Sequence, residues 1–460
     1  IERDGTLGGT CLNRGCIPSK ALLTAVHSVE TIHNAERMGI NATLQSIDFG
    51  RLRDFRVSTV ETMTKGLTGL LAHRGVTVFR GCAALQNAHT VRVTPAEGET
   101  QVSRSVEAGV FEPVETELAI DADDVVLATG SRPLALPGNP FAGALIDSTQ
   151  ALELNTLPSS AVIIGAGAVA LEFASLWNAA GCEVTLLIRK DRVLSTWERR
   201  ASMTLTRELK RRGVNVIART AVDRVDTGAN LGATVHYRQG DSDEDRTAYG
   251  EVVLAAIGRV PNTDADWFRS SGLKLDERGY VTVDGYGRTN LDGVWALGDI
   301  TPGHALAHRA FEQGITIAEK IAGADPKPVL DDTVPQVVFS FPEAASVGLT
   351  LDQAKAREDV VEPKETAYPM LSNARMLMSG EGGSMTVVSG AFANNPDMQV
   401  VLGVHIVSPI ASDLIAEAEQ LVGNRVPLAD AARLIHPHPT FSETLGEALL
   451  KADGRPLHTR

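Results

Sequence analysis

Cysteine and aromatic residues are scarce in this chain. Its 460 residues include four cysteines, and 5% of them are aromatic. So few cysteines over this length exclude the dense disulfide framework of small secreted proteins and indicate a reducing compartment, for which we expect the cytoplasm. In such a compartment, two cysteines close in sequence are more typical of a catalytic or metal-binding site than of a structural staple.

The sequence also lacks an excess of positive charge and a long apolar run. Its formal net charge of −14 argues against nucleic acid and anionic lipid as partners, because both bind basic surfaces. The most apolar stretch, residues 161–177, contains Glu172 and two glycines and is too interrupted to span a membrane. Neither an initiator methionine nor a signal-like leader opens the chain, so we expect no signal peptide and a natural start farther upstream.

The length exceeds the range over which one hydrophobic core grows, so the sequence predicts about two to four domains. Short apolar runs alternate with helical patterns up to about residue 330, which is typical of buried parallel sheets. These predicted strands lie within residues 123–130, 161–167, 182–188, 251–258 and 293–299. The charged run 240–246 predicts a solvated hairpin tip. From about residue 332, alternating strands followed by helices from Ser412 predict a separate α+β domain.

A glycine-rich turn with the spacing G-x-G-x-x-G/A lies between a predicted strand and a predicted helix at residues 162–172. In this spacing Gly165 permits the tight turn, Gly167 lets the backbone approach a pyrophosphate, and Ala170 keeps the helix close to the strand. A second predicted strand ends about 20 residues later, as in dinucleotide-binding domains. We therefore expect a dinucleotide site here, the alternative being a plain tight turn.

Positive residues follow that second strand, where an NAD site usually places a carboxylate on the ribose. Ile188 is followed by Arg189 and Lys190. A guanidinium and an ammonium attract a 2′-phosphate that a carboxylate repels, so the sequence favours NADP over NAD. In the alternative interpretation these are solvated surface charges, paired with Asp191 and Glu198.

Two cysteines, Cys11 and Cys16, stand five positions apart in the run GGTCLNRGCIPSK. The apolar spacing after Cys16 predicts a helix with Pro18 in its first turn, so that Cys16 lies at a helix N-terminus with Lys20 one turn on. Both features stabilise a thiolate. They favour a reactive pair over a structural one.

Metal binding is the other chemistry open to paired thiols. A zinc site would need Cys82 and Cys182 in addition to the pair, yet both are isolated in the sequence and have no histidine at ligand spacing. They are typical of small apolar side chains that pack in a core. We therefore expect no metal site.

The segment HPHPTFSETLGE, residues 436–447, carries two histidines and an acid at Glu443. A histidine whose second ring nitrogen is held by a carboxylate is oriented and made more basic, which suits a proton shuttle for a thiol. The spacing alone leaves helix capping and metal binding as alternatives.

Together these motifs resemble the class I pyridine nucleotide-disulfide oxidoreductases, and most closely their dihydrolipoamide dehydrogenase branch. The run GGTCLNRGCIPSKALL resembles the redox-disulfide signature of that family, and HPHPTFSE resembles its C-terminal base motif. The run LAHRAFEQG at residues 306–314 resembles a segment beside the flavin. The similarity extends from residue 2 to about residue 450 in family order.

The resemblance implies an α/β fold with two Rossmann-like dinucleotide-binding domains and a C-terminal α+β dimerisation domain. The implied domains are an FAD-binding domain at 1–153, an NAD(P)-binding domain at 154–264, a central part completing the FAD domain at 265–331 and a dimerisation domain at 332–460. An obligate homodimer follows. The glycine-rich phosphate loop for FAD is absent, so we expect it about 20 to 30 residues upstream of this chain.

The resemblance also implies roles for the candidate catalytic residues. Cys11 matches the interchange thiol that meets the substrate, and Cys16 matches the charge-transfer thiol that faces the flavin. His438 with Glu443 matches the base pair, which in this family reaches into the partner subunit's site.

Cofactor-binding residues are implied in the same way. Lys20 and Glu172 match an ion pair near the flavin N5, Asp299 matches the aspartate that binds the ribityl chain, and Glu2 matches the acid that binds the adenosine ribose. The remaining implied cofactor-binding residues are Gly9, Thr10, Thr129, Gly130, Gly258, Arg259, Ala307 and His308.

The sequence departs from the branch at the nicotinamide site. Ile188 stands where dihydrolipoamide dehydrogenases usually have an acid, and the runs LLIRKDRVL and AIGRVPNT are more similar to glutathione reductase. The implied cofactors are therefore FAD with either NADP or NAD. No cysteine pair follows Glu447, which argues against mercuric reductase and a thioredoxin reductase-like extension.

Three function hypotheses follow. The first is dihydrolipoamide dehydrogenase activity, in which electrons pass between a redox-active Cys11–Cys16 disulfide, FAD and NAD(P), with a lipoyl carrier as substrate and a 2-oxoacid dehydrogenase complex as a candidate partner. The second is NADPH-dependent reduction of a low-molecular-weight disulfide such as that of glutathione or mycothiol. The third is a non-catalytic, redox-responsive interaction protein, which would not need the nicotinamide turn, Asp299 and the His438–Glu443 pair together.

Overall fold

The computed structural model describes residues 1–228 and 232–459, and the chain divides into two compact units of three stretches each. The first unit comprises Ile1–Ala25, Ser46–Pro133 and Arg259–Asp331, and the second comprises Val26–Gln45, Leu134–Gly258 and Asp332–Arg460. Within the described residues, no helix has both the length and the apolar character needed to cross a membrane. The predicted domain boundaries at 153/154, 264/265 and 331/332 stay predictions.

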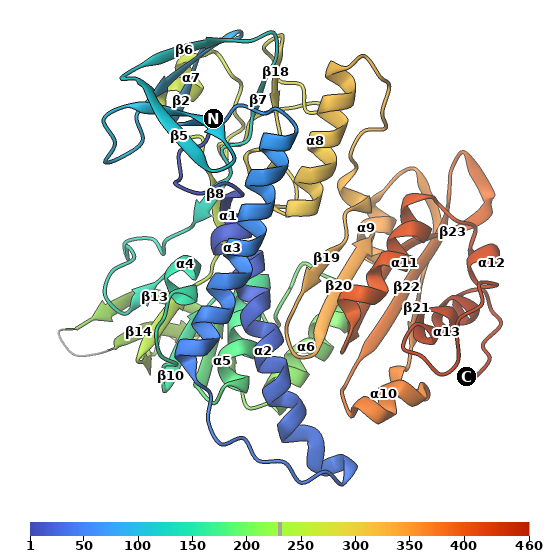
Figure 1. Cartoon of the computed structure of the whole chain (residues 1–460). Coiled ribbons are helices and arrows are strands. Elements are labelled where there is room, and N and C mark those ends of the chain that lie inside the picture. The colour runs from blue at the N-terminus through green and yellow to red at the C-terminus, as the bar shows by residue number, and fades with distance from the viewer. Residues whose placement is uncertain (229–231, 460) are drawn as a thin grey trace. The chain divides into compact units, whose positions relative to one another are not determined.

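The first unit combines short strands with longer helices (Figure 1). Its helices are α1 (Gly9–Arg14), the first part of α2 (Cys16–Asn34), α3 (Phe49–His73), η2 (Gly298–Ile300), α7 (Asp266–Ser270), α8 (Ala307–Ile321) and the start of η3 (Asp331–Thr333). Its strands are β1 (Phe79–Arg80), β2 (Cys82–Asn87), β3 (Thr90–Thr94), β4 (Val102–Glu107), β5 (Val110–Glu115), β6 (Leu118–Asp121), β7 (Val125–Leu127), β8 (Ser131–Pro133), β17 (Arg259–Pro261) and β18 (Val294–Ala296).

Strands β7 and β18 are the strands predicted within residues 123–130 and 293–299. They pair in parallel, with Val125 opposite Val294. The other strands of this unit form antiparallel sheets in the orders β1-β4-β5, β2-β3-β6 and β17-β8. Leu127 of β7 and Val294 and Ala296 of β18 pack into a core that includes Phe268 and Ile300. Because Asp299 lies three residues after the end of β18 and next to Ile300, this core fixes the backbone position of a candidate site residue.

The second unit contains the remaining helices and strands of the residues that the structure describes. Its helices are the end of α2, η1 (Ala35–Met38), α4 (Ser148–Leu152), α5 (Ala168–Ala179), α6 (Arg199–Arg211), α9 (Leu351–Ala356), η4 (Met370–Ser372), α10 (Ala374–Ser379), α11 (Ala411–Gly423), α12 (Leu428–Ala431) and α13 (Glu443–Ala452). Its strands are β9 (Leu145–Ile146), β10 (Ser160–Ile164), β11 (Glu183–Ile188), β12 (Asn215–Ala218), β13 (Thr220–Thr227), β14 (Ala233–Gln239), β15 (Arg246–Gly250), β16 (Val252–Ala255), β19 (Gln336–Val338), β20 (Glu343–Gly348), β21 (Val360–Tyr368), β22 (Ser384–Phe392) and β23 (Asn395–Ser408).

A parallel sheet in the order β12-β11-β10-β16-β9 forms the first part of this unit. Its strands β10, β11 and β16 are apolar runs that the sequence predicts as buried. Ile164 at the end of β10 aligns with Leu187 on one side and Ala255 on the other. The carboxyl ends of neighbouring strands therefore meet at one edge, where Gly165 and Arg189 follow β10 and β11.

A smaller antiparallel sheet, β13-β14-β15, follows the parallel sheet in the chain. Strand β14 ends at Gln239 and β15 begins at Arg246, with Tyr237 opposite Arg246. The predicted hairpin tip at residues 240–246 is confirmed by this pairing.

The C-terminal part of the second unit is an antiparallel sheet in the order β19-β20-β23-β22-β21. Helix α11 packs on β20 and β23, and α13 packs on β21 and β22, as the orange and red elements of Figure 1 show. Strand β22 is buried along nearly its whole length, because helix α6 also packs against β22 and β23. The predicted order of elements after residue 332, alternating strands and then helices, is confirmed. The α/β fold class is confirmed as well.

Candidate active site

Cys11 and Cys16 lie on consecutive helices of the first unit, α1 and α2. Helix α2 begins at Cys16, as the apolar spacing predicts. Gly15 joins the helices in a tight turn, where an added Cβ would lie 3.0 Å from the carbonyl oxygen of Thr10. Ser19 donates its backbone N–H to Gly15 and its hydroxyl to the carbonyl of Cys16, which fixes the start of α2.

The Cys11 thiol hydrogen-bonds to Cys16, and this bond raises the pKa of Cys11 far above its usual range. Burial of Cys11 and the charge of Cys16 act in the same direction. The contact with Cys16 therefore favours the protonated form of Cys11. The helix N-terminus at Cys16 and Lys20 one turn on suit a negative charge on Cys16. The structure holds both residues as thiols.

Asp299, Ser131 and Arg259 form a hydrogen-bonded cluster in the first unit. The buried Ser131 hydroxyl donates to Oδ2 of Asp299 at 2.5 Å and accepts from Nε of Arg259 at 2.7 Å. Nε of Arg259 lies 3.9 Å from the same carboxylate oxygen. These contacts orient the Asp299 carboxylate.

Helix α8 begins close to this cluster, with Ala307 and His308 in its first turn. The N-cap residue Leu306 provides no side-chain hydrogen bond. Thr129 donates its hydroxyl to the carbonyl of Asn262 at 2.9 Å. Gly130 follows with φ +71°, and nothing lies within 4 Å of an added Cβ there.

At the N-terminal end of the chain, the backbone of Glu2 forms an isolated parallel β-bridge with that of Arg80. The Glu2 side chain accepts the backbone N–H of Asp4 on Oε1 at 2.9 Å. Gly9 and Thr10 open helix α1, and Gly9 has φ +61° with open space where a Cβ would be.

The donor set of the first unit fits FAD. The carboxylates of Glu2 and Asp299 suit ribose and ribityl hydroxyls, and the N-terminus of α8 suits a phosphate. At Gly9 and Gly130 the missing Cβ lets a ligand come close to the backbone. The binding roles of these residues stay predictions.

The glycine turn after β10 is tight at Gly165 and open at Gly167. Gly165 has φ +141°, and a Cβ there would lie 2.2 Å from the carbonyl oxygen of Ala256. Gly167 is the N-cap of α5, provides no side-chain cap, and has nothing within 4 Å of an added Cβ. Ala170 is completely buried. An uncapped N-terminus of a 12-residue helix fits a pyrophosphate.

Glu172 lies on α5 and is buried. Its Oε1 accepts the backbone N–H of Phe339 at 3.2 Å. Lys20 belongs to the first unit and Glu172 to the second, so the ion pair that the resemblance implies stays a prediction. Gly258, at the end of the second unit's middle stretch, has φ +143° with open space around it.

Arg189 and Lys190 are exposed after β11. Asp191 pairs instead with Arg192, at 3.0 Å. Glu198 caps α6 by accepting the N–H groups of Arg200 and Ala201 at 2.6 and 2.7 Å. Both carboxylates that the alternative interpretation assigns to Arg189 and Lys190 are therefore engaged elsewhere.

His438 and Glu443 form a hydrogen-bonded pair at the start of α13. Nδ1 of His438 lies 2.7 Å from Oε1 of Glu443, and the second carboxylate oxygen accepts the N–H of Thr440 at 2.8 Å. Burial opposes these contacts, yet the pKa of Glu443 is lowered because Thr440 and His438 donate to it. The His438 side chain is 76% exposed, so its Nε2 edge faces outward.

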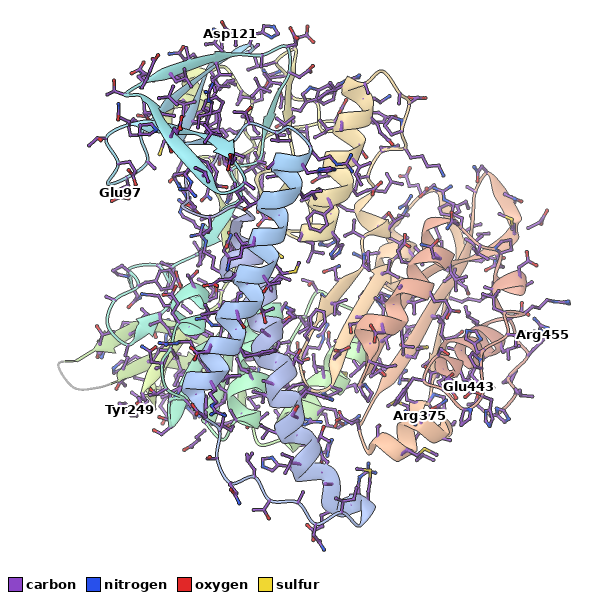
Figure 2. All side chains as sticks on the ribbon, viewed as in Figure 1. Glu97, Asp121, Tyr249, Arg375, Glu443 and Arg455 are labelled. Carbon is purple, nitrogen blue, oxygen red and sulfur yellow. The ribbon has the colours of Figure 1, made fainter. Side chains whose placement is uncertain are left out.

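The segment around this pair is held by neighbouring elements. Figure 2 labels Glu443 together with Arg375, which comes from α10. The Arg375 guanidinium lies 5.1 Å from the ring centre of Phe441, and Asn373 donates to the carbonyl of Thr440 at 2.9 Å.

The other histidine of the motif, His436, binds a different acid. Its Nε2 lies 2.8 Å from Oε1 of Glu417 on α11, so the two histidines do not converge on one site. Across residues 1–228 and 232–459, no group of three or more His, Cys, Asp or Glu side chains could hold a metal ion.

Sequence reasoning missed two residues that orient the candidate site residues. Ser131 follows Gly130 directly but carries no motif of its own, and its link to Asp299 spans 168 residues. Glu417 lies in an ordinary helical pattern 19 residues before His436. Only the first histidine of the HPHP run, His436, gave a signal for that neighbourhood.

Comparison with known proteins gives one family over nearly the whole chain. The pyridine nucleotide-disulphide oxidoreductase family matches residues 1–314, and its dimerisation domain matches residues 334–449. A dihydrolipoyl dehydrogenase of Geobacillus stearothermophilus is 37% identical over 100% of this chain and 92% of the relative. The mitochondrial dihydrolipoyl dehydrogenase of Pisum sativum is 33% identical over 100% of this chain and 87% of the relative.

Solved structures share the fold. LpdA from Mycobacterium tuberculosis superposes with a TM-score of 0.83 at 26% identity, covering 97% of this chain and 92% of that one. The HOCl-induced flavoprotein disulfide reductase RclA from Escherichia coli has a TM-score of 0.78 at 24% identity with the same coverage, a likeness that supports the fold alone.

These matches confirm the family that the sequence motifs suggest and the expectation of an enzyme. They do not favour the low-molecular-weight disulfide reductase, and a non-catalytic sensor does not fit full-length similarity to enzymes. The chain belongs to the pyridine nucleotide-disulphide oxidoreductases, enzymes that work with FAD and a nicotinamide dinucleotide.

Proposed function

We propose that this chain is a dihydrolipoyl dehydrogenase, which oxidises the dithiol of dihydrolipoamide to lipoamide and reduces NAD(P)⁺ to NAD(P)H with release of a proton. The observation that carries the proposal is the 33–37% identity to dihydrolipoyl dehydrogenases over the full length of the chain. The Cys11–Cys16 and His438–Glu443 pairs support it, because dithiol oxidation needs an electron-accepting disulfide and a base.

FAD supplies, when bound, the redox chemistry that connects the cysteine pair to the nicotinamide ring. The residues proposed to hold it are Glu2, Gly9, Thr10, Lys20, Thr129, Gly130, Arg259, Asp299, Ala307 and His308. The residues proposed for the nicotinamide dinucleotide are Gly165, Gly167, Ala170, Glu172, Arg189, Lys190 and Gly258. The corresponding domain roles are FAD binding for residues 1–153 and 265–331, NAD(P) binding for 154–264 and dimerisation for 332–460.

The cysteine pair performs the thiol–disulfide exchange. A substrate thiolate attacks Sγ of Cys11, the Cys11–Cys16 bond breaks, and Cys16 leaves as a thiolate. The second substrate thiolate then attacks the substrate sulfur bound to Cys11, which closes the cyclic disulfide of the product and releases Cys11. The two electrons lost by the substrate now reside on the two cysteines.

The environments of the two sulfurs suit this division of roles. Cys16 is the better leaving thiolate, because it starts helix α2 and has Lys20 one turn on. Cys11 is released as a thiolate and takes up a proton, because its hydrogen bond to Cys16, its burial and the charge of Cys16 raise its pKa.

His438 is the proposed base for the substrate thiols. Its Nδ1–H is held by the Glu443 carboxylate, which fixes the tautomer and leaves Nε2 to accept a proton. The lowered pKa of Glu443 keeps this partner anionic while His438 becomes a cation, since burial is outweighed by hydrogen bonds from Thr440 and His438. The pair therefore favours formation of a substrate thiolate.

The dimerisation domain supports a homodimer. In the proposed arrangement, His438 of each subunit serves the cysteine pair of the other, which agrees with the exposure of its imidazole. A lipoyl carrier of a 2-oxoacid dehydrogenase complex is the proposed physiological substrate, and the cytoplasm is the proposed compartment.

The proposed dinucleotide preference is NADP(H). Arg189 and Lys190 are exposed beyond the end of β11, and the carboxylates of Asp191 and Glu198 bind other groups. Two cations at this edge of the sheet attract the 2′-phosphate.

The test is a steady-state assay of the FAD-loaded chain with dihydrolipoamide and either NAD⁺ or NADP⁺, and of glutathione and mycothiol disulfides with NADPH. We expect rapid oxidation of dihydrolipoamide and no turnover of either small disulfide. Turnover of a small disulfide without turnover of dihydrolipoamide would overturn the proposal.

A further inference from the structure

The two histidines at 436 and 438 have opposite environments. The side chain of His436 is 9% exposed and that of His438 is 76% exposed. His438 uses one ring nitrogen to bind Glu443, whereas His436 uses both. Its Nδ1 lies 3.2 Å from the carbonyl oxygen of Leu434, and its Nε2 lies 2.8 Å from Oε1 of Glu417. One imidazole is thus fixed at both nitrogens and the other at one.

The contacts of His436 define its protonation state. A carbonyl oxygen and an ionised carboxylate can only accept, so both ring nitrogens must donate, as only the imidazolium does. The pKa of His436 is raised, first by its hydrogen bond to Glu417. Burial opposes this effect, while the charge of Glu417, the Leu434 carbonyl and the charge of Glu443 add to it.

Helix α13 leaves room for this ring. A Cβ added at Gly446 would lie 2.4 Å from Nδ1 of His436. Glycine is unfavourable within a helix compared with alanine, so its presence in the first turns of α13 is explained by the ring beside it. His436 therefore contacts α11 through Glu417 and α13 through Gly446, and α13 also carries Glu443.

We propose that His436, held by Glu417, is a positioning residue for the His438–Glu443 base pair. It fastens the backbone two residues before His438 to α11 and α13, so that the exposed imidazole projects from a fixed point. Its positive charge also acts on Glu443 and favours the carboxylate that binds His438. The inference rests on the proposed function of His438 as the base, and neither the motif nor the family match assigns a role to His436.

The charges around His436 come from two helices. Glu417 faces it from α11 and Glu443 from α13. One turn beyond Glu443, Glu447 binds the His458 imidazole at 2.8 Å. The charge of His458 also lowers the pKa of Glu443. His458 is therefore left unchanged in every variant, so that its effect on Glu443 is the same in all of them.

The first test is the isosteric variant Glu417→Gln, in which the amide oxygen still accepts from Nε2 but carries no charge. The pKa of His436 then falls toward or below the ordinary histidine value of about 6.5, and above that pH the neutral ring loses one of its two donors. We expect the ratio of variant to wild-type kcat for dihydrolipoamide to be near one at about pH 5.5 and to fall about 10-fold by about pH 8.

The second test is His436→Gln, whose amide group has two donor hydrogens and no charge. We expect a kcat reduced about 10-fold across the pH range, with KM for the nicotinamide dinucleotide unchanged. His236→Gln is the matched control, because His236 also binds carboxylates, Asp226 at 2.9 Å and Asp245 at 3.4 Å, but lies on β14. A pH-independent ratio for Glu417→Gln, or a loss no greater than that of His236→Gln, would overturn the proposal.

A third readout does not depend on turnover. In ¹³C-histidine NMR spectra, we expect His436 of the wild-type holoenzyme to be protonated at pH 7, and the His438 ring resonances at that pH to move in Glu417→Gln. A neutral His436 at pH 7, or unmoved His438 resonances, would overturn the inference. If the wild type does not oxidise dihydrolipoamide, the proposed function fails, and the spectra still decide the link between the two histidines.

Discussion

Cys11 gives its thiol hydrogen bond to the sulfur of Cys16, so the two cysteines of the site are not equivalent. Replacing each with serine should separate their roles. Cys16→Ser should abolish the long-wavelength absorbance that a thiolate produces beside the flavin, because it removes the sulfur on which negative charge develops. Cys11→Ser should retain that absorbance and lower kcat by at least about 100-fold, because it removes the sulfur that the substrate thiolate attacks.

The measurement is the visible spectrum of each variant, loaded with FAD and reduced by two electrons, together with its turnover of dihydrolipoamide. Cys182→Ser is a matched control, because Cys182 is buried and lies on the second unit. Equal spectral effects of Cys11→Ser and Cys16→Ser would contradict the assignment.

The two glycines of the turn after β10 should respond differently to alanine. At Gly165 the φ of +141° and the approach of the Ala256 carbonyl leave no room for a Cβ. Gly165→Ala should therefore destabilise the fold by about 2 kcal/mol or more, visible as a lower thermal midpoint. At Gly167 a Cβ meets nothing, so Gly167→Ala should change stability by less than about 0.5 kcal/mol.

Gly167→Ala should nevertheless raise KM for the dinucleotide by about 10-fold or more, because its methyl group occupies the place where the pyrophosphate approaches the backbone. Thermal unfolding and steady-state kinetics of the two variants check this contrast. An unchanged KM in Gly167→Ala would refute pyrophosphate binding at this turn.

Charge reversal at Arg189 tests the dinucleotide preference. Arg189→Glu should weaken NADPH binding about 10- to 100-fold, the effect of losing one charge-assisted hydrogen bond, and should leave NADH binding unchanged or improved. The measurement is the ratio of kcat/KM for the two dinucleotides. Lys210→Glu, an exposed site on α6 with the same change of charge, is the control. If Arg189→Glu leaves the ratio where it is, the proposed NADP preference is wrong.

Local patterns in the sequence were sufficient for the elements that position the site. The apolar spacing after Cys16 predicts α2 from its first residue, and the turn at Gly165 follows from the spacing of small residues between a strand and a helix. Both depend on neighbours within a few positions. This is why periodicity and turn chemistry recover them.

Contacts between distant segments could not be predicted in this way. The hydrogen bond from Ser131 to Asp299 joins β8 to the turn after β18, and no local pattern distinguishes Ser131 from other serines at the end of a loop. The Glu417–His436 contact depends on the packing of α11 beside the segment before α13. Such contacts follow from tertiary packing, which a single sequence does not encode in a readable spacing.

The buried His405 on β23 predicts a pH effect on stability. Nε2 lies 3.2 Å from the carbonyl oxygen of Leu349 and must donate to it, so Nδ1 accepts the Ser346 hydroxyl at 2.7 Å. The neutral ring therefore satisfies both contacts, and burial lowers the pKa of His405. The unfolded chain, with a histidine pKa of about 6.5, binds a proton that the folded chain does not.

The stability that neutral His405 contributes is thus complete above about pH 6.5 and decreases as the pH falls from that value toward the folded pKa. His405→Gln cannot titrate, so the difference in thermal midpoint between wild type and variant should be constant above about pH 7 and should shrink below about pH 6.5. His436, whose pKa is raised, acts in the opposite direction, but it is present in both proteins and cancels in the difference. A midpoint difference that stays constant down to pH 5, or grows as the pH falls, would show that His405 is not held neutral in the folded chain.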